Sequence, residues 1–482
     1  MERNDRITLT RLTRTSRDRQ VSLAEKIGFA SGAFGLGICT MLLRIHLVFF
    51  YSDIVGVAAG LIGIAALVAN AWDAVSDPAM GILSDRTHSR YGRRRIYLML
   101  GAVPLALCTF LLWSPPGGLA YQMLFPYALG VLLLLFTFLT VCAVPHMALG
   151  AELSYDPNQR AQVYGARYIA ENSGALVAAT IPFIYLEQAG NARGGYAVVG
   201  SITSAVIVSL MLVSFLTTRE RTLQKLTPKS NRGTARGAAA VADYYRDLLG
   251  TLRNRPLWYL LAAAVAVEVG TGITYTLMTF VAKYWLHMEQ LRAALFLVYM
   301  VTAMLSVPAW VAISRRIGKK YVYIFSQLVI SAVLFLVVFL EPGRILRAFS
   351  LMTIGGWGIG GYALLPALIA DLADLDEYER GVRREGSCFG LYSLCRKGAM
   401  ALGIFIASKG LDIIGYVPGM SDPERIVPGL RMLFGPMTGL ITLLGALIFL
   451  RFPFTKARHE QIRIALKQRK EADNEIAARE TS

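Results

Sequence analysis

The stretch that decides the fold is WDAVSDPAMGILSDRTHSRYGRRR, residues 72–95. Two carboxylates, Asp73 and Asp77, interrupt an apolar segment that runs back to about Val57. Residues four apart on a helix share one face, with Cβ atoms about 5–6 Å apart. A carboxylate near the middle of a bilayer costs at least about 2.5–3.5 kcal/mol on insertion scales. We therefore predict that the two carboxylates form a cation site.

The rest of the chain has the composition of a membrane protein. It contains 482 residues, of which 55% are hydrophobic, and its mean hydropathy is +0.49. Its apolar segments are long enough to cross a hydrocarbon core of about 30 Å. They lie at about 25–51, 57–84, 96–114, 121–149, 163–187, 194–217, 257–286, 293–313, 321–340, 345–370, 386–412 and 428–451. The sequence predicts an all-α polytopic protein with twelve transmembrane helices. The polar, basic first twenty residues do not resemble a cleavable signal peptide.

Charge divides the chain into parts. The net charge of +17 is concentrated in the ends and in alternate loops, which argues against nucleic-acid binding and fits the positive-inside rule. We expect a multi-pass protein of the plasma (inner) membrane with both termini cytoplasmic, acting as a monomer within the lipid bilayer. Its parts are a basic tail at 1–23, a six-helix bundle at 24–217, a basic linker at 218–255, a second six-helix bundle at 256–453 and a tail at 454–482.

The loop after the second apolar segment has a counterpart in the second half. The first copy contains Asp85, Arg86, Gly92, Arg93 and Arg94, and residues 314–320 (SRRIGKK) repeat its basic, glycine-containing pattern. We predict that Asp85, Arg86, Arg93 and Arg94 form a cytoplasmic latch. In this latch, a helix-end aspartate bonds arginines of the neighbouring helix. The alternative is that these charges only orient the chain in the membrane.

Ionisable residues inside apolar segments are functional candidates by default. Arg167, Glu268 and Lys397 are the main ones here. Arg167 also stands four residues before Glu171, so a structural ion pair is an alternative. Pro78 disfavours helix at Asp77, and we expect a local distortion there that frees carbonyl groups.

Several motifs together make the chain recognisable. The motifs lie in both halves of the chain and have the spacing found in a known family. They are residues 73–78 with the following arginine-rich loop, residues 370–379 (ADLADLDEYE), residues 383–385, Lys397 and residues 415–418 (GYVP). The chain resembles the glycoside–pentoside–hexuronide:cation symporter family over about residues 26–453. That resemblance implies the major facilitator fold, two pseudo-symmetric six-helix bundles, and cation-coupled symport by alternating access. It implies no enzymatic activity and no cofactor beyond the coupling ion, Na⁺ or H⁺.

The resemblance also assigns the cation site. Asp73 and Asp77 match the family's cation carboxylates, and the only metal expected on them is Na⁺. Ser76 and Thr140 match polar ligands, and the hydroxyl pair favours Na⁺ over H⁺. Lys397 matches a lysine that balances the carboxylates until a cation replaces it.

Two positions that differ from the family's sugar carriers bear on the substrate. Ala143 and Met147 stand where sugar carriers of the family hold an aspartate and a tryptophan. A second branch carries lysophosphatidylcholine, and Arg167 and Glu268 resemble its head-group residues. We therefore expect an amphiphile such as a lysophospholipid, with a sugar, glycoside or uronide as the alternative.

Two further alternatives concern this small-molecule site. Polar residues such as Tyr392 support the sugar alternative. Glu268 could instead pair with Lys397, Arg396 or Arg44 as a gate. The five histidines are scattered without a metal or nucleophile pattern, which argues against an enzyme.

Overall fold

The computed structural model describes residues 20–154, 156–188, 191–220, 255–380, 385–420 and 422–453, with a few positions in 246–251 and 458–468. Their regular structure is helical, and no strand occurs among them. Twelve helical segments in this part of the chain are long and apolar enough to cross a membrane. The predicted all-α fold with twelve transmembrane helices is thereby confirmed. Most of the predicted linker and nearly all of both tails lie outside the described residues.

Two compact units divide the chain. Described residues of 1–43 and 75–237 form the first unit, and those of 44–74 and 238–482 form the second. The segment 44–74 therefore groups with the second unit, although the sequence places it in the first bundle. The bundle boundaries at 24–217 and 256–453 remain a prediction.

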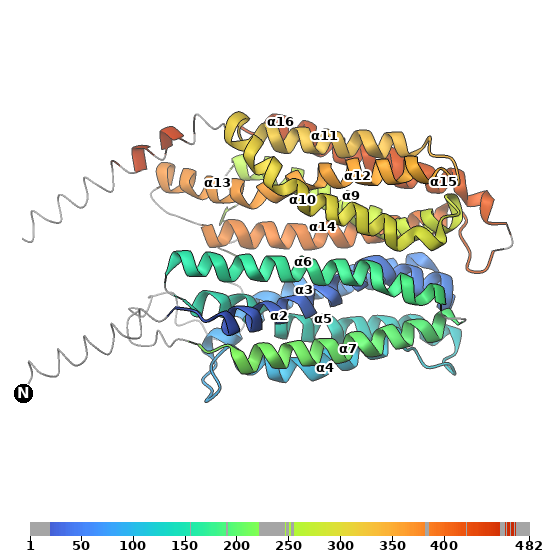
Figure 1. Ribbon diagram of the computed structural model, residues 1–482, viewed down its shortest axis with the longest axis horizontal. Helices are drawn as coiled ribbons and strands as arrows, with labels where there is room; N and C mark the ends of the chain where they lie inside the picture. The colour runs from blue at the N-terminus through green and yellow to red at the C-terminus, as the bar shows by residue number, and fades with distance from the viewer. Residues whose placement is uncertain are drawn as a thin grey trace, which may run out of the picture. The chain divides into compact units, whose positions relative to one another are not determined.

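The first unit contains helices that the apolar runs anticipate within a few residues, except that α6 begins at Pro157 and not near 163. They are most of α2 (Leu23–Phe49), the last part of α3 (Ala59–Arg86), α4 (Arg95–Trp113), α5 (Tyr121–Glu152), α6 (Pro157–Gln188) and α7 (Ala192–Thr217). Local signals begin two of them. Ser22 and Glu25 form a reciprocal capping box at α2, and the Asn191 side chain accepts bonds from two backbone N–H groups at the start of α7. Helix α4 packs against both α5 and α7 (Figure 1).

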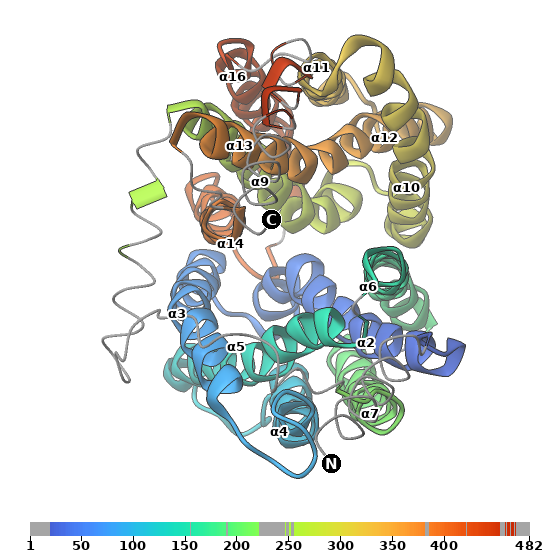
Figure 2. The same cartoon turned by 90° about the vertical axis from the view of Figure 1, so that its left-hand side faces the viewer.

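The second unit contains the remaining helices and several short irregular turns. They are η1 (Phe50–Val55), the first part of α3, α9 (Arg255–Phe280), η2 (Val281–Trp285), η3 (Glu289–Leu291), α10 (Arg292–Ile317), α11 (Lys319–Val337), α12 (Ile345–Gly360), η4 (Gly361–Leu364), α13 (Leu365–Arg380), α14 (Glu385–Ile413), η5 (Pro423–Ile426), α15 (Val427–Met432), η6 (Leu433–Met437) and α16 (Thr438–Leu450). Helix α9 packs against α14 and α16, and α10 packs against α12 (Figure 2). A buried apolar core joins α9, α11, α13, α14 and α16 around Leu260, Tyr323 and Phe449.

Glycines allow the closest helix crossings. In the first unit, an added Cβ at Gly37 would collide with the carbonyl oxygen of Glu171, and one at Gly174 with that of Phe34. In the second unit, Gly403 of α14 lies against the backbone of α9. Small residues at such crossings let helices approach within a bilayer, where dispersion contacts provide much of the attraction.

A repeated brace fixes the start of the third helix in each half. Arg94 donates to the carbonyl oxygen of Ala148 and lies 3.4 Å from the carboxylate of Glu152, four residues later. Lys319 donates to the carbonyl oxygen of Ala367 at 3.4 Å and to the carboxylate of Asp371, again four residues later, at 2.7 Å. In each half, the basic residue therefore contacts a carbonyl oxygen and, four residues later, a carboxylate of a neighbouring helix, which is α5 in the first half and α13 in the second.

The next basic residue of each half completes the brace. Arg95 Nε donates to the carbonyl oxygen of Phe215 at 3.2 Å, near the end of α7. Lys320 Nζ donates to that of Phe452 at 2.7 Å, just beyond α16. The similarity between the two loops in the sequence thus corresponds to the same bonding pattern in each half.

Candidate functional site

Asp73 and Lys397 form a close ion pair within the second unit. Lys397 Nζ of α14 donates to Asp73 Oδ2 of α3 at 2.6 Å, and the Asp73 side chain is only 5% exposed. An ion pair this close is a charge-assisted hydrogen bond, which is stronger than a neutral one. The lysine that the sequence assigned as a counter-charge therefore contacts one of the two predicted carboxylates.

Asp77 has different partners within the first unit. Thr140 Oγ1 of α5 donates to Asp77 Oδ1 at 3.1 Å, and Ser76 Oγ lies 3.2 Å from the same threonine oxygen. The carboxylate and the two hydroxyls thus gather oxygen atoms of the type that hard cations prefer. No group of three or more His, Cys, Asp or Glu side chains that could hold a metal occurs among the described residues.

Helix α3 presents both carboxylates. It continues through Pro78 to Arg86, so the expected distortion at Asp77 does not end the helix. Proline lacks a backbone donor, and the helix nevertheless extends about two turns beyond it. Asp73 and Asp77 therefore keep the one-face spacing that their positions in the sequence predict.

Glu268 is the centre of a second polar group, also within the second unit. It is 4% exposed on α9 and accepts a hydrogen bond of 2.8 Å from the hydroxyl of Tyr362. The hydroxyls of Tyr362 and Tyr392 lie 3.0 Å apart, and Arg396 approaches the Glu268 carboxylate at 3.6 Å. Of the basic partners considered for Glu268, Arg396 is therefore the one that approaches it. Lys397, the next residue of the chain, bonds Asp73 instead.

The sequence did not reveal the role of Tyr362. This residue lies in η4, a short 3₁₀ turn that interrupts the helix between α12 and α13. Gly360 and Gly361 sit directly against Ser306 and Ser326, where no larger residue fits without movement. The glycine pair before Tyr362 is the signal that could have identified this turn.

The remaining predicted residues lie in the first unit. Arg167 pairs with Glu171 at 3.1 Å, which is the ion pair considered as the alternative to a substrate role for Arg167. The Met147 side chain is largely exposed. Arg94 lies 2.6 Å from Asp85, and Arg93 Nε donates to Glu152 at 3.0 Å.

The predicted cytoplasmic latch around Asp85 and Arg94 also has a component that the sequence did not suggest. Glu220, after α7, accepts hydrogen bonds of 2.7–2.8 Å from the backbone N–H groups of Arg93, Arg94 and Arg95. This carboxylate therefore caps the start of α4, where the helix dipole favours negative charge. Gly92 adopts a positive φ of 105° beside it. Arg86 is exposed at the end of α3.

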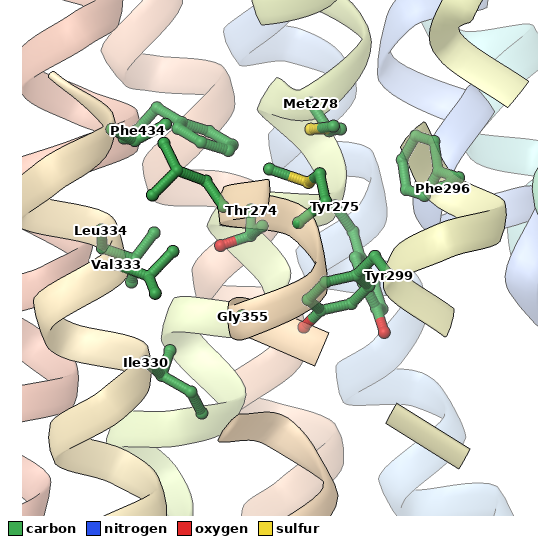
Figure 3. Close-up of a pocket in the computed structure, with 13 residues that line it drawn as sticks. Thr274, Tyr275, Met278, Phe296, Tyr299, Ile330, Val333, Leu334, Gly355 and Phe434 are labelled. Carbon is green, nitrogen blue, oxygen red and sulfur yellow. The ribbon is translucent and has the colours of Figure 1, made fainter. Parts of the chain in front are cut away.

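A cavity in the second unit is a different kind of site. It lies between α9, α10, α11, α12 and η6, where side chains such as Met278, Phe296 and Leu334 surround it (Figure 3). None of its lining residues is charged, and Thr274 already donates to the carbonyl oxygen of Gly270 at 2.8 Å. The remaining hydroxyls of its lining belong to Tyr275 and Tyr299, so most of the cavity is apolar and it offers a sugar few polar groups.

Comparisons with known proteins identify the family. A family model described as "MFS/sugar transport protein" matches residues 28–456. The putative glycoside/cation symporter YagG of Escherichia coli is 27% identical, over 95% of this chain and 97% of that protein. The glucuronide carrier protein homolog of Escherichia coli is 25% identical, over 95% and 98%.

A solved structure supports the same fold. The nucleoside transporter NupG matches with a TM-score of 0.62 at 13% identity, over 89% of this chain and 98% of that chain. The names of the curated relatives are those of symporters and carriers, which confirms the expectation of a membrane transporter rather than an enzyme. The chain belongs to the glycoside–pentoside–hexuronide:cation symporter family of the major facilitator superfamily.

Proposed function

We propose that this protein is a cation-coupled symporter that accumulates a sugar or glycoside by alternating access. The observation that carries the proposal is the Asp73–Lys397 ion pair of 2.6 Å on a helix that also presents Asp77. A carboxylate neutralised by a lysine can exchange that lysine for an incoming cation. Related proteins named for glycosides and glucuronides support the sugar alternative, and we set aside the expectation of a lysophospholipid.

The coupling step follows from electrostatics. Lys397 stabilises Asp73 in the absence of a coupling ion, because an unpaired buried carboxylate is costly. A cation held by Asp73 and Asp77, with the hydroxyls of Ser76 and Thr140, takes over that stabilisation and frees the ammonium group. Two conformations with different affinities for the cation then exchange populations, which is the basis of symport. We propose Na⁺ as the first coupling ion to test and H⁺ as its alternative.

The Glu268 group supplies groups suited to a sugar. A carboxylate accepts hydrogen bonds from sugar hydroxyls, and the hydroxyls of Tyr362 and Tyr392 can donate or accept. Arg396 offers a positive charge to an acidic sugar. A site that hydrogen-bonds hydroxyls discriminates strongly against ligands that lack them, because its buried polar groups would then be left unpaired.

The orientation in the membrane remains part of this proposal. The basic loops at 86–95 and 315–320, together with the basic ends of the chain, support a topology with both termini on the cytoplasmic side of an inner (plasma) membrane. The connection between α2 and α3, which contains Asp53, then faces the opposite side.

Transport by purified protein in proteoliposomes tests the function. Labelled galactosides, β-glucuronides and xylosides are offered under an inward Na⁺ gradient, an inward H⁺ gradient or no gradient. We expect at least one glycoside to accumulate above its external concentration under one cation gradient only. Lysophosphatidylcholine serves as the lipid comparison. Equal uptake with and without gradients, or lipid uptake without glycoside uptake, would overturn the proposal.

Replacing Glu268 by glutamine is expected to weaken substrate binding. Gln keeps the shape but loses the charge that accepts the hydrogen bond from Tyr362. A hydrogen bond to a charged group contributes about 1.5–3 kcal/mol and one to a neutral group about 0.5–1.5 kcal/mol, so the difference corresponds to a rise in KM of roughly 5- to 10-fold. The measurement is the KM for the accumulated glycoside. Glu341→Gln is the matched control, because Glu341 pairs with Arg344 on the exposed surface. An unchanged KM in Glu268→Gln would remove Glu268 from the substrate site.

A further inference from the structure

Asp53 is a buried carboxylate that the cation site does not use. Its side chain is 4% exposed in η1, the turn that follows α2. Lys283 Nζ donates to Asp53 Oδ2 at 2.6 Å, and the hydroxyl of Tyr416 donates to Asp53 Oδ1 at 2.8 Å. The hydroxyl of Tyr284 donates to the same oxygen. All four residues belong to the second unit. Three donors from two separate parts of the chain therefore hold one carboxylate.

The two charges occupy corresponding places in the two halves. The first long helix of each half, α2 and α9, ends in a π-helical turn, η1 or η2. Asp53 lies in η1 and Lys283 lies in η2. The last residues of α2 and α9, Phe49 and Phe280, pack edge to face with ring centroids 5.4 Å apart. Single π-helical turns are rare and are frequently found at functional sites.

The surroundings of the pair favour a closed contact. Lys283 Nζ lies 5.6 Å from the ring centroid of Phe49, and Arg292 lies 5.8 Å from the same centroid. Glu289 pairs with Arg292 at 3.2 Å and is half exposed. Burial, followed by the charge of Asp53, raises the pKa of Tyr416, so its hydroxyl stays protonated and able to donate.

A second contact fastens the other end of the 50–60 hairpin, the segment that runs from η1 to the start of α3. The carboxylate of Asp412, at the end of α14, accepts the backbone N–H of Gly60 at 3.1 Å and caps the start of α3. Lys409 lies 3.4 Å from the same carboxylate. Any side chain at residue 60 would collide with these two groups. The hairpin is thus held at both of its ends by charged side chains.

We propose that Asp53, Lys283 and Tyr416 form a latch that fastens the 50–60 hairpin to the C-terminal helices and opens once in each transport cycle. The proposal rests on the alternating access proposed above. A buried ion pair adds little net stability over an apolar contact, because its charges give up their hydration. They recover that hydration when the contact opens. An ionic latch can therefore be specific when closed and still open at a modest free-energy cost.

Cysteine accessibility tests the latch without any substrate. Ser52 is fully buried in η1, and Ser52→Cys in a background lacking the five native cysteines provides the reporter. The purified protein in nanodiscs is reacted with a polar maleimide. We expect Asp53→Asn and Lys283→Met each to raise the labelling rate about tenfold or more, and the Asp53→Lys/Lys283→Asp exchange to lower it again. Labelling at the unmodified rate in both single variants would overturn the latch.

Transport kinetics distinguish a latch from a general structural role. A weakened latch favours the open state, so KM and kcat are both expected to fall in Asp53→Asn, whereas general destabilisation lowers kcat without lowering KM. Tyr416→Phe, which removes one donor, is the milder variant if Asp53→Asn folds poorly. Glu341→Gln is the matched control for an exposed ion pair. Altered labelling in a protein that transports no glycoside would overturn the proposed function and keep the latch. Raised KM with unchanged labelling would overturn the latch alone.

Discussion

Replacement of Asp73 by asparagine is expected to abolish cation-driven accumulation of the substrate. Asparagine keeps the shape of the side chain but removes the charge that faces Lys397 at 2.6 Å. Removing one partner of a buried ion pair costs about 3–5 kcal/mol. The cost lies at the lower end here, because the Lys397 side chain is 29% exposed and keeps part of its hydration. The coupling cation at the same time loses one of its two proposed carboxylates.

The measurement is the steady-state ratio of internal to external substrate in proteoliposomes. For Asp73→Asn we expect a ratio of about one under either cation gradient, because RT ln of the ratio measures the coupled driving force. The double variant Asp73→Asn/Lys397→Met removes both charges, so we expect it to be more stable than the single variant and equally uncoupled. Asp422→Asn, at an exposed position, is the control. Full concentrative uptake by Asp73→Asn would contradict the proposed cation site.

Replacement of Gly403 by alanine is expected to destabilise the second unit. An added Cβ at this position of α14 collides with the carbonyl oxygen of Val269 and lies 3.0 Å from the Cα of Gly272. Both obstacles are backbone atoms of α9, so no side chain can move aside. Overpacking commonly costs about 1–3 kcal/mol and occasionally more. A crossing that is closed by backbone on both sides belongs at the upper end of that range.

Gly398 provides the matched control on the same helix. An added Cβ at this glycine has open space around it, with no atom within 4 Å. Gly398→Ala and Gly403→Ala change α14 by the same methyl group and gain the same helix propensity. We expect the thermal midpoint of purified Gly403→Ala to fall by several degrees and that of Gly398→Ala to stay level or rise. Equal midpoints for the two variants would show that the helix crossing tolerates a side chain.

Much of the fold follows from local sequence, because the bilayer leaves the backbone few alternatives. Apolar runs must satisfy their own hydrogen bonds, so their lengths predict helices such as α4 and α5 within a few residues. The pairing of Lys397 with Asp73 could also be anticipated, since each buried charge needs an opposite one. Their separation of 324 residues was bridged by the family resemblance rather than by any local pattern.

The missed features depend on long-range geometry. Tyr362 and Asp53 look ordinary in the sequence, and their roles arise from partners on other helices. Glu220 caps α4 from a position more than a hundred residues away, which no local capping rule detects. Lys283 likewise finds its buried partner, Asp53, in a distant part of the chain. At Pro78 the helix continues to Arg86, and the local distortion expected at Asp77 stays a prediction.

The repeated braces have a consequence for experiments on membrane insertion. Arg94 and Lys319 belong to the basic loops to which we attribute the orientation of the chain, and each also bonds a neighbouring helix. Neutralising them to invert the topology would remove an orientation signal and a structural bond at once. The experiment would then not distinguish a chain inserted in the wrong orientation from a correctly inserted chain that lacks the bond between its helices. Charge added at exposed loop positions, with these two residues kept, separates insertion from assembly.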